Sequence, residues 1–373
     1  MEITGIRVYR ADLPLTEGFY AWSTQSFTAF DTTVVAIDTD EGITGYGETC
    51  PLGPAYLPAY PQGARTGIAT MAEHLIGWDP TALDVINARM DEVMKGHPYA
   101  KSAIDMACWD IHGKATGLAV SHLLGGQAQE KVKLFKVVTR ADPGAMAERL
   151  QEYQADGFTQ FQVKVGEDPA RDIDRMRRCA EVMRAGEVMD ADANTGWRQH
   201  DALRIAHAME TLQERHPEIG IYLEQPCISY AECLAVRRST RLPLVLDEVM
   251  TDPDALICGA TDRAMDLVNL KINRMGGLTR ARQMRDLCLH FGIAMTIEDS
   301  WGGEIATSAI AHLAASTPAS HHWQSSAFHA YHDVAIASGA PEIEDGWMRP
   351  STTPGLGVEP DFSVLGSPVF VQH

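Results

Sequence analysis

The sequence predicts an α/β protein with two parts: an N-terminal α+β capping domain and a (β/α)7β TIM-like barrel. Two observations lead to this prediction. The first 50 residues alternate apolar and polar positions, and three helical patterns follow them. From residue 127 onward, short apolar runs alternate with amphipathic segments. Such a strand–helix repeat is typical of a parallel sheet, and seven or eight units close most economically into a barrel.

Residues 1–126 are expected to form the capping domain. The turn sequence Asp-Glu-Gly at 40–42 separates two alternating runs, which predicts a hairpin within a three-stranded antiparallel meander. Residues 17–30 are rich in Gly, Ser, Thr and aromatic residues and have no strong period, so we expect a long loop that acts as a lid. Three helices are expected between residues 64 and 124, where apolar residues recur at helical spacing.

Residues 127–350 are expected to form the barrel. Each predicted strand is a short apolar run, and helical patterns lie between the runs. The predicted strands lie at 134–139, 161–166, 187–194, 219–226, 242–248, 266–273, 293–300 and 321–326. The last segment, residues 351–373, has no helical period and is expected to return to the capping domain.

Composition limits the partners of the protein. The 373 residues are 45% hydrophobic and 22% charged, which is typical of a folded globular chain. Because 31 Lys and Arg stand against 50 Asp and Glu, the formal charge is −19, which disfavours nucleic acid and anionic membranes as partners. The N-terminus lacks the apolar run of a signal peptide, and the seven cysteines lack CxxC spacing. We expect a cytoplasmic protein with no membrane span, and we expect it to form a homo-oligomer.

Ionisable residues recur at the ends of the predicted barrel strands. They follow one another at intervals of 23 to 32 residues, which matches one strand–helix unit: Lys164, Asp192, Glu224, Asp247, Lys271 and Asp299. Because the carboxyl ends of parallel barrel strands converge on one mouth, we expect three adjacent acids between two lysines there. Carboxylate oxygens are ligands that Mg²⁺ prefers, so Asp192, Glu224 and Asp247 predict a magnesium site.

Each acid, taken alone, could instead be the N-cap of the helix that follows its strand. Their recurrence at successive strand ends favours a shared site, because caps need not converge on one point. The two lysines could be ion-paired structural residues, but each lies within an apolar strand, where an unpaired lysine is rare. Asn194 and Glu248 are expected to orient the ligands from behind.

Such a site suits the removal of a proton next to a carboxylate. A metal ion that binds the substrate carboxylate stabilises the enediolate that forms when the proton leaves. Lys164 and Lys271 on opposite faces could then remove a proton on one side and deliver one on the other, if burial and the cation lower the pKa of the lysine that acts as the base. The predicted activity is racemisation, epimerisation or elimination.

Several motifs recur in an order and spacing that resemble the enolase superfamily, specifically its mandelate racemase and muconate lactonizing enzyme branch. They are GYGE at 45–48, AIDMACWDIHGK at 103–114, VKVG at 163–166, DADAN at 190–194, LEQP at 223–226, LDE at 246–248 and LKINRMGG at 270–277. The resemblance implies metal ligation by Asp192, Glu224 and Asp247 and acid/base roles for Lys164 and Lys271. Many relatives of the muconate lactonizing type carry a further lysine where this chain has Gln162.

Three segments are most similar to members that act on proline derivatives, namely cis-3-hydroxy-L-proline dehydratases and epimerases of 4-hydroxyproline betaine or proline betaine. The segments are GETCPLGPAYLPAY at 47–60, KGHPYAKSAIDMA at 95–107 and IEDSWGGEI at 297–305. The resemblance implies a small carboxylate substrate with a cationic ring nitrogen. Side chains that could bind this substrate by charge or aromatic faces are Asp299, Glu298, Trp323, Trp22 and Tyr20.

The segment at 297–305 is nearer to the dehydratase version, so elimination of water is the favoured reaction. The alternative is 2-epimerisation or racemisation of a proline betaine or another amino acid derivative, which uses the same two lysines without a leaving group. A barrel that only binds a cation or an amine is a third possibility, and the presence of both lysines speaks against it.

Overall fold

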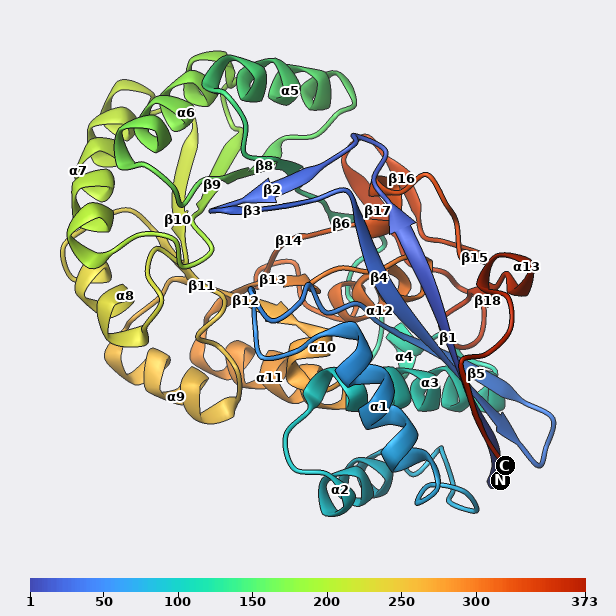
Figure 1. Cartoon of the computed structure of the whole chain (residues 1–373). Coiled ribbons are helices and arrows are strands. Elements are labelled where there is room, and N and C mark those ends of the chain that lie inside the picture. The colour runs from blue at the N-terminus through green and yellow to red at the C-terminus, as the bar shows by residue number, and fades with distance from the viewer.

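The computed structural model describes residues 1–373 as an N-terminal α+β domain joined to a parallel barrel (Figure 1). The predicted fold class is therefore confirmed. The N-terminal sheet has the order β19-β1-β4-β5, with β1 (Ile3–Pro14), β4 (Ala29–Thr39), β5 (Thr44–Thr49) and β19 (Phe370–Gln372). Strand β19 pairs antiparallel with β1, so the end of the chain adds a fourth strand to this sheet.

Helices α1 (Pro61–Ala72), α2 (Leu83–Val93) and α3 (Pro98–Thr116) pack against the N-terminal sheet around a separate cluster of 17 buried apolar residues. Helix α3 lies directly against β5. A Cβ atom on Gly45 or Gly47 would lie 2.2 or 2.0 Å from a backbone oxygen of α3, so only glycine permits this approach. The two glycines of the GYGE motif thus have a packing role.

The barrel contains eight parallel strands in sequential order from β7 to β14. They are β7 (Lys136–Val138), β8 (Gln160–Lys164), β9 (Val188–Asp192), β10 (Gly220–Glu224), β11 (Leu244–Leu246), β12 (Leu267–Lys271), β13 (Ala294–Glu298) and β14 (His322–Ser325). The first and last strands meet where Phe135 N donates to Ser325 O at 3.0 Å, beside a parallel bridge between Leu134 and Ser325. The pairing register places Lys164 beside Asp192, and Asp192 beside Glu224.

Helices surround the barrel on the outside, as the ring from α5 to α9 shows in Figure 1. They are α5 (Pro143–Ala155), α6 (Pro169–Val182), α7 (Gln199–Arg215), α8 (Tyr230–Arg237), α9 (Pro253–Asp262), α11 (Leu278–Phe291) and α12 (Glu304–Ala315). The short helix α10 (Ile272–Met275) follows β12 directly and packs against α3. Local signals begin and end them: Asp168 caps α6, Ser229 and Glu232 form a capping box on α8, and Gly292 in the left-handed region ends α11.

Shorter elements complete the chain. Helix α4 (Val120–Leu123) follows α3, and a three-stranded sheet joins β6 (Val132–Lys133), β16 (Glu342–Glu344) and β17 (Trp347–Arg349). The others are a 3-10 turn (Phe328–Tyr331), β15 (Ala337–Ser338), β18 (Glu359–Pro360) and α13 (Phe362–Leu365). None of the helices combines the length and hydropathy that crossing a membrane requires.

Residues 17–30 contain a hairpin of β2 (Tyr20–Trp22) and β3 (Gln25–Phe27), which Figure 1 shows reaching from the N-terminal domain to the barrel. Its tip is bonded to the loops that follow β8 and β9. Ser23 N donates to Val165 O at 3.1 Å, and Ser23 Oγ donates to Ala193 O at 2.8 Å. This hairpin therefore covers part of the barrel mouth.

Buried carboxylates of the N-terminal domain bind the barrel at the start of two helices. Glu48 accepts hydrogen bonds from Gly303 N at 2.7 Å and Ala306 N at 2.9 Å, where α12 begins. Asp105 accepts from Thr279 N at 3.0 Å, where α11 begins. A carboxylate at a helix N-terminus satisfies unpaired N–H groups and the helix dipole. These contacts fix the N-terminal domain above the mouth of the barrel.

Candidate active site

Four carboxylates and two lysines lie at the carboxyl ends of the barrel strands, and all six side chains are buried. The carboxylates are Asp192 on β9, Glu224 on β10, Asp247 after β11 and Glu298 on β13, and the lysines are Lys164 on β8 and Lys271 on β12. A narrow cavity lined by Lys164, Lys271 and Glu298 reaches the lid hairpin. The structure thus brings the predicted metal ligands and both predicted catalytic lysines to one place.

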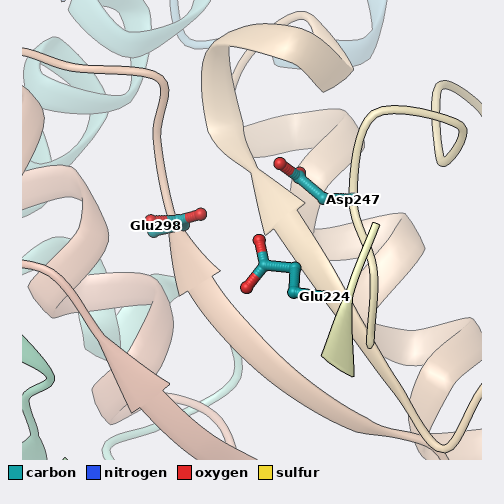
Figure 2. Close-up of side chains that lie close together, drawn as sticks. All are labelled: Glu224, Asp247 and Glu298. Atoms are coloured by element: carbon teal, nitrogen blue, oxygen red, sulfur yellow. The ribbon is translucent and has the colours of Figure 1, made fainter. Parts of the chain in front are cut away.

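Three of the carboxylates are directed toward one another in Figure 2. Glu224, Asp247 and Glu298 each offer an oxygen, and these oxygens lie within 4.8 Å of one another. Asp192 faces differently: one of its oxygens accepts a hydrogen bond from Lys164, and the other accepts from Asn194 N at 2.7 Å. Glu298, which we assigned to substrate from the sequence, is therefore grouped with two of the predicted ligands.

Glu224 lies at the centre of the acidic group. Its oxygens accept hydrogen bonds from Gln162 Nε2 at 3.1 Å and from Asn269 Nδ2 at 2.5 Å. Burial, together with nearby Asp192 and other acids, raises the pKa of Glu224 well above its usual range. Gln162 therefore orients a carboxylate here.

Lys271 and Arg274 flank Asp247. Lys271 Nζ lies 2.8 Å from Asp247 Oδ2 and 3.4 Å from Glu298 Oε1, while Arg274 Nη1 lies 2.7 Å from Asp247 Oδ1. Burial opposes the ionisation of Asp247, but these two cations hold the pKa of its carboxyl group well below the usual range. The phenol of Tyr56 also reaches this group, with its oxygen 2.6 Å from Lys271 Nζ.

Lys164 faces the cavity from the other side. Strands β8 and β12 are four places apart in the eight-stranded order, so the two lysines stand on opposite sides of the barrel. Lys164 pairs with Asp192, and its Nζ lies 5.9 Å from the centre of the Tyr20 ring. Burial disfavours the charged form of both lysines, but the adjacent carboxylates raise the pKa of each above its ordinary value.

Asn194 and Glu248, which we predicted to orient the ligands, lie beside Asp192 and Asp247, and Asn194 also lines the cavity. Asn194 Nδ2 donates to Glu248 Oε1 at 3.0 Å, and Asn194 adopts a left-handed backbone with φ of 42°. Burial and the charges of Asp247 and Asp192 raise the pKa of Glu248 to about 8. Oδ1 of Asp247 is paired only with Arg274, and one oxygen of Glu248 has no hydrogen-bond donor. An oxygen without a donor among several buried carboxylates fits a bound hard cation.

The predicted substrate-binding residues separate into two groups. Tyr20 and Trp22 line the cavity from the lid with ring centres 5.3 Å apart, and Asp299 lines it from the barrel. Asp299 accepts hydrogen bonds from two backbone N–H groups, and burial raises its pKa to about 7. Trp323 does not line the cavity. It packs against Tyr222 with ring centres 4.6 Å apart, deeper in the barrel than Glu224, and we leave it out of the proposed substrate site.

Three residues of the site were missed in the sequence, namely Tyr56, Asn269 and Arg274. Asn269 could have been found, because it lies two positions before Lys271 on the same strand and so shares its face. Tyr56 falls within the segment at 47–60, which resembles the members acting on proline derivatives, but no periodicity places its side chain at the barrel mouth. Arg274 follows Lys271 by three residues in a short helix.

A parallel barrel with opposed lysines around buried carboxylates defines a protein that can bind a cation and exchange protons with a bound acid. Comparison with known families agrees with this description. Residues 6–125 match the N-terminal domain of mandelate racemase and muconate lactonizing enzyme, and residues 145–364 match the enolase C-terminal domain-like family. The chain therefore belongs to the mandelate racemase and muconate lactonizing enzyme branch of the enolase superfamily.

Individual relatives cover almost the whole chain. A cis-3-hydroxy-L-proline dehydratase of Roseibium aggregatum is 50% identical over 370 residues, which is 99% of both chains. An N-succinyl-L-Arg/Lys racemase of Bacillus cereus is 31% identical over 84% of both chains. A solved mandelate racemase/muconate lactonizing enzyme of Roseovarius nubinhibens complexed with magnesium superposes over 100% of both chains, with a TM-score of 0.95 and 34% identity.

Proposed function

We propose that this enzyme is a Mg²⁺-dependent dehydratase of cis-3-hydroxy-L-proline. The observation that carries the substrate is the 50% identity to a dehydratase of that compound, which extends over 99% of both chains. The chemistry is supported by Lys164 and Lys271, which face a buried carboxylate group from opposite sides. A protein that only bound a cation or an amine would not require two opposed lysines.

We infer that Asp192, Glu224 and Asp247 hold the metal ion, with Glu298 close beside them. The support is that these carboxylates are buried together at the barrel mouth. Asp192 pairs with Glu224 in the strand register, and oxygens of Glu224, Asp247 and Glu298 lie within 4.8 Å of one another. Bound Mg²⁺ supplies positive charge that stabilises an enediolate and offsets the negative charge that now favours protonated lysines. To bind the ion, Asp192 would have to release its contact with Lys164.

The residues of the chain then carry the proton transfers. A lysine amine takes the proton from C2 of the substrate, the C2–H electron pair forms the C2=C3 bond, and the 3-hydroxyl leaves as water after it gains a proton. The enamine product tautomerises to pyrroline-2-carboxylate. Tyr20 and Trp22 on the lid cover the cavity and limit the access of bulk water. Glu298 and Asp299 supply negative charge for the ring ammonium.

The second candidate function is 2-epimerisation or racemisation of a proline betaine or another amino acid derivative. It is supported by the racemases and epimerases among the relatives, such as the Bacillus cereus racemase. Opposed lysines serve this reaction equally well, because one removes the α-proton and the other returns it to the opposite face. What separates the two reactions is whether the substrate carries a leaving group at C3.

We also propose that the protein is a homo-oligomer. Several apolar side chains near the C-terminus are exposed, including Phe362, Val364, Val369 and Val371. Exposed apolar surface of this kind is a candidate contact between subunits. Sedimentation equilibrium tests this: a single species of 40.8 kDa would exclude the oligomer.

Proton NMR in D₂O tests the reaction. The protein with Mg²⁺ is mixed separately with cis-3-hydroxy-L-proline and with 4-hydroxyproline betaine, and a sample with EDTA is the control. Dehydratase activity removes the hydroxyproline signals and produces a pyrroline carboxylate. Deuterium at C2 of the betaine together with a second diastereomer would instead identify the epimerase. No change in either substrate would overturn the assignment to proline derivatives.

A further inference from the structure

Tyr56 stands between the capping domain and the reacting groups of the barrel. It lies between β5 and α1, and its ring lines the mouth cavity, with its centre 6.1 Å from that of Trp22 on the lid. Its phenol oxygen is 2.6 Å from Lys271 Nζ and 3.1 Å from Asp247 Oδ2. Neither the acid/base pair of lysines nor the proposed ligand set accounts for a hydroxyl group at this point.

The direction of these hydrogen bonds follows from the groups themselves. A lysine ammonium can only donate, so the phenol oxygen accepts from Lys271. The single phenol hydrogen therefore points to Asp247, which accepts it. When Asp247 acts as a metal ligand, its oxygen is less available to that hydrogen. The Tyr56 hydroxyl can then donate its hydrogen to another acceptor in the cavity, and the Lys271 ammonium can reprotonate the phenol oxygen.

The shape of the proposed substrate requires a proton donor on one particular side. In cis-3-hydroxy-L-proline the hydroxyl and the carboxylate lie on the same face of the ring, so the hydrogen on C2 lies on the opposite face. The base and the donor to the leaving hydroxyl must therefore stand on opposite sides of the ring. Lys164 Nζ contacts Asp192 and the face of the Tyr20 ring, and no hydroxyl group is hydrogen-bonded to it.

We propose that Tyr56 is a catalytic residue that protonates the departing hydroxyl, with Lys164 as the base and Lys271 as the group that reprotonates Tyr56. This inference rests on the proposed dehydratase function. The C2–H bond breaks and its proton goes to Lys164 Nζ, while the electron pair forms the C2=C3 bond. The C3–O bond breaks, the oxygen takes the phenol hydrogen and leaves as water, and the Lys271 ammonium returns a proton to the phenolate. Three protons move, so that Lys164 ends protonated and Lys271 neutral, and no oxidant or reductant is needed.

The test compares the wild type with Tyr56→Phe in D₂O with Mg²⁺ and cis-3-hydroxy-L-proline. Loss of the phenol should slow elimination about 100-fold or more, as is usual for a lost general acid. Proton removal by Lys164 should continue, so deuterium should accumulate at C2 of the unreacted substrate. Lys164→Gln should differ from Tyr56→Phe, because it should lose both elimination and deuterium exchange. Tyr60→Phe is the matched control, because Tyr60 is exposed on the same segment and should leave both rates unchanged.

Calorimetry of Mg²⁺ binding to Tyr56→Phe without substrate provides a readout that does not depend on turnover. Binding within about threefold of the wild type is expected, since Tyr56 donates to Asp247 but is not itself a ligand. Slowing of elimination and exchange by the same factor, or loss of Mg²⁺ binding, would reduce Tyr56 to a structural role and overturn the inference. Unchanged elimination in Tyr56→Phe would overturn it while leaving the dehydratase function standing. Failure of the wild type to eliminate water would overturn the proposed function itself.

Discussion

Replacing Glu224 with Gln should stabilise the metal-free protein and abolish its stabilisation by magnesium. Glu224 is fully buried among Asp190, Asp192 and Asp247, and burial together with these charges raises its pKa well above the usual range. The folded state therefore favours the protonated acid, and ionised Glu224 destabilises the metal-free protein at pH 7. Glutamine keeps the shape of the side chain and removes the charge.

The size of the effect follows from two opposing contributions. Glutamine cannot accept both present hydrogen bonds, from Gln162 and Asn269, so the variant loses about 1–2 kcal/mol. Each unit by which the pKa of Glu224 is raised, up to pH 7, gives back about 1.4 kcal/mol at pH 7. Since that pKa is raised well above its usual value, Glu224→Gln is expected to unfold at a higher temperature than the wild type in EDTA.

Magnesium should stabilise only the wild type. At a free concentration of about 100 times Kd, a ligand adds about 2.7 kcal/mol to the folded state. The unfolding entropy of a chain of 373 residues is about 0.8 kcal/mol/K, so Tm should rise by about 3 °C. Glu224→Gln lacks one of the proposed ligands, so its Tm should change by less than about 1 °C at the same concentration.

Thermal unfolding followed by circular dichroism, in EDTA and with Mg²⁺, measures both effects. Glu214→Gln is the control, because Glu214 is exposed and pairs with Arg241, far from the site; it should respond to Mg²⁺ as the wild type does. An equal Mg²⁺ shift in Glu224→Gln would show that Glu224 is not a ligand. A lower Tm of that variant in EDTA would refute the reasoning about its charge.

Three further predictions concern packing, the lid and pH. Gly47→Ala places a Cβ atom 2.0 Å from a backbone oxygen of α3 and should lower the free energy of unfolding in urea by at least about 3 kcal/mol. The control is Gly144→Ala, whose Cβ meets nothing within 4 Å and should change that free energy by less than about 0.5 kcal/mol. Similar losses in both variants would be evidence against the close contact. Ser23→Ala removes the 2.8 Å hydrogen bond between the lid and the barrel, which is worth about 1 kcal/mol, so KM should rise about fivefold with a smaller change in kcat. An unchanged KM would mean that this hydrogen bond does not hold the lid closed. Burial lowers the pKa of His312 to about 4, so the stability contributed by its neutral form is present above pH 6.5 and is lost toward pH 4, at up to about 1.4 kcal/mol per pH unit. His312→Gln should reduce the dependence of the unfolding free energy on pH, measured by urea titrations at several pH values. An unchanged dependence would assign it to other groups.

The barrel and the level of its polar residues could be predicted because both depend on local repetition. Each strand–helix unit carries its own apolar period, and successive parallel strands end at the same rim. Lys164, Asp192 and Glu224 therefore lie beside one another in the observed register. The position of Asn269 was readable for the same reason, from the alternation of side chains along β12.

Trp323 illustrates where that alternation fails. The register between β13 and β14 shifts, so that His322 pairs with Met295 and Gln324 with Thr296, while Trp323 has no partner in the ladder. At such an irregularity, counting by twos no longer tells which way a side chain points. The indole consequently packs on Tyr222, deeper in the barrel, instead of facing the mouth.

The sequence by itself determined the two-part architecture, the order of the barrel strands and the set of acids and lysines at their ends, because these depend on patterns within short segments. Only the tertiary structure decided which groups meet across the chain. Tyr56 reaches Lys271 over a separation of 215 residues, and its segment has no period that predicts a direction. Its place is set by the docking of the N-terminal domain, where Glu48 and Asp105 bind the first turns of α12 and α11. Those contacts join segments far apart in the chain where the two domains pack together, which no local pattern encodes.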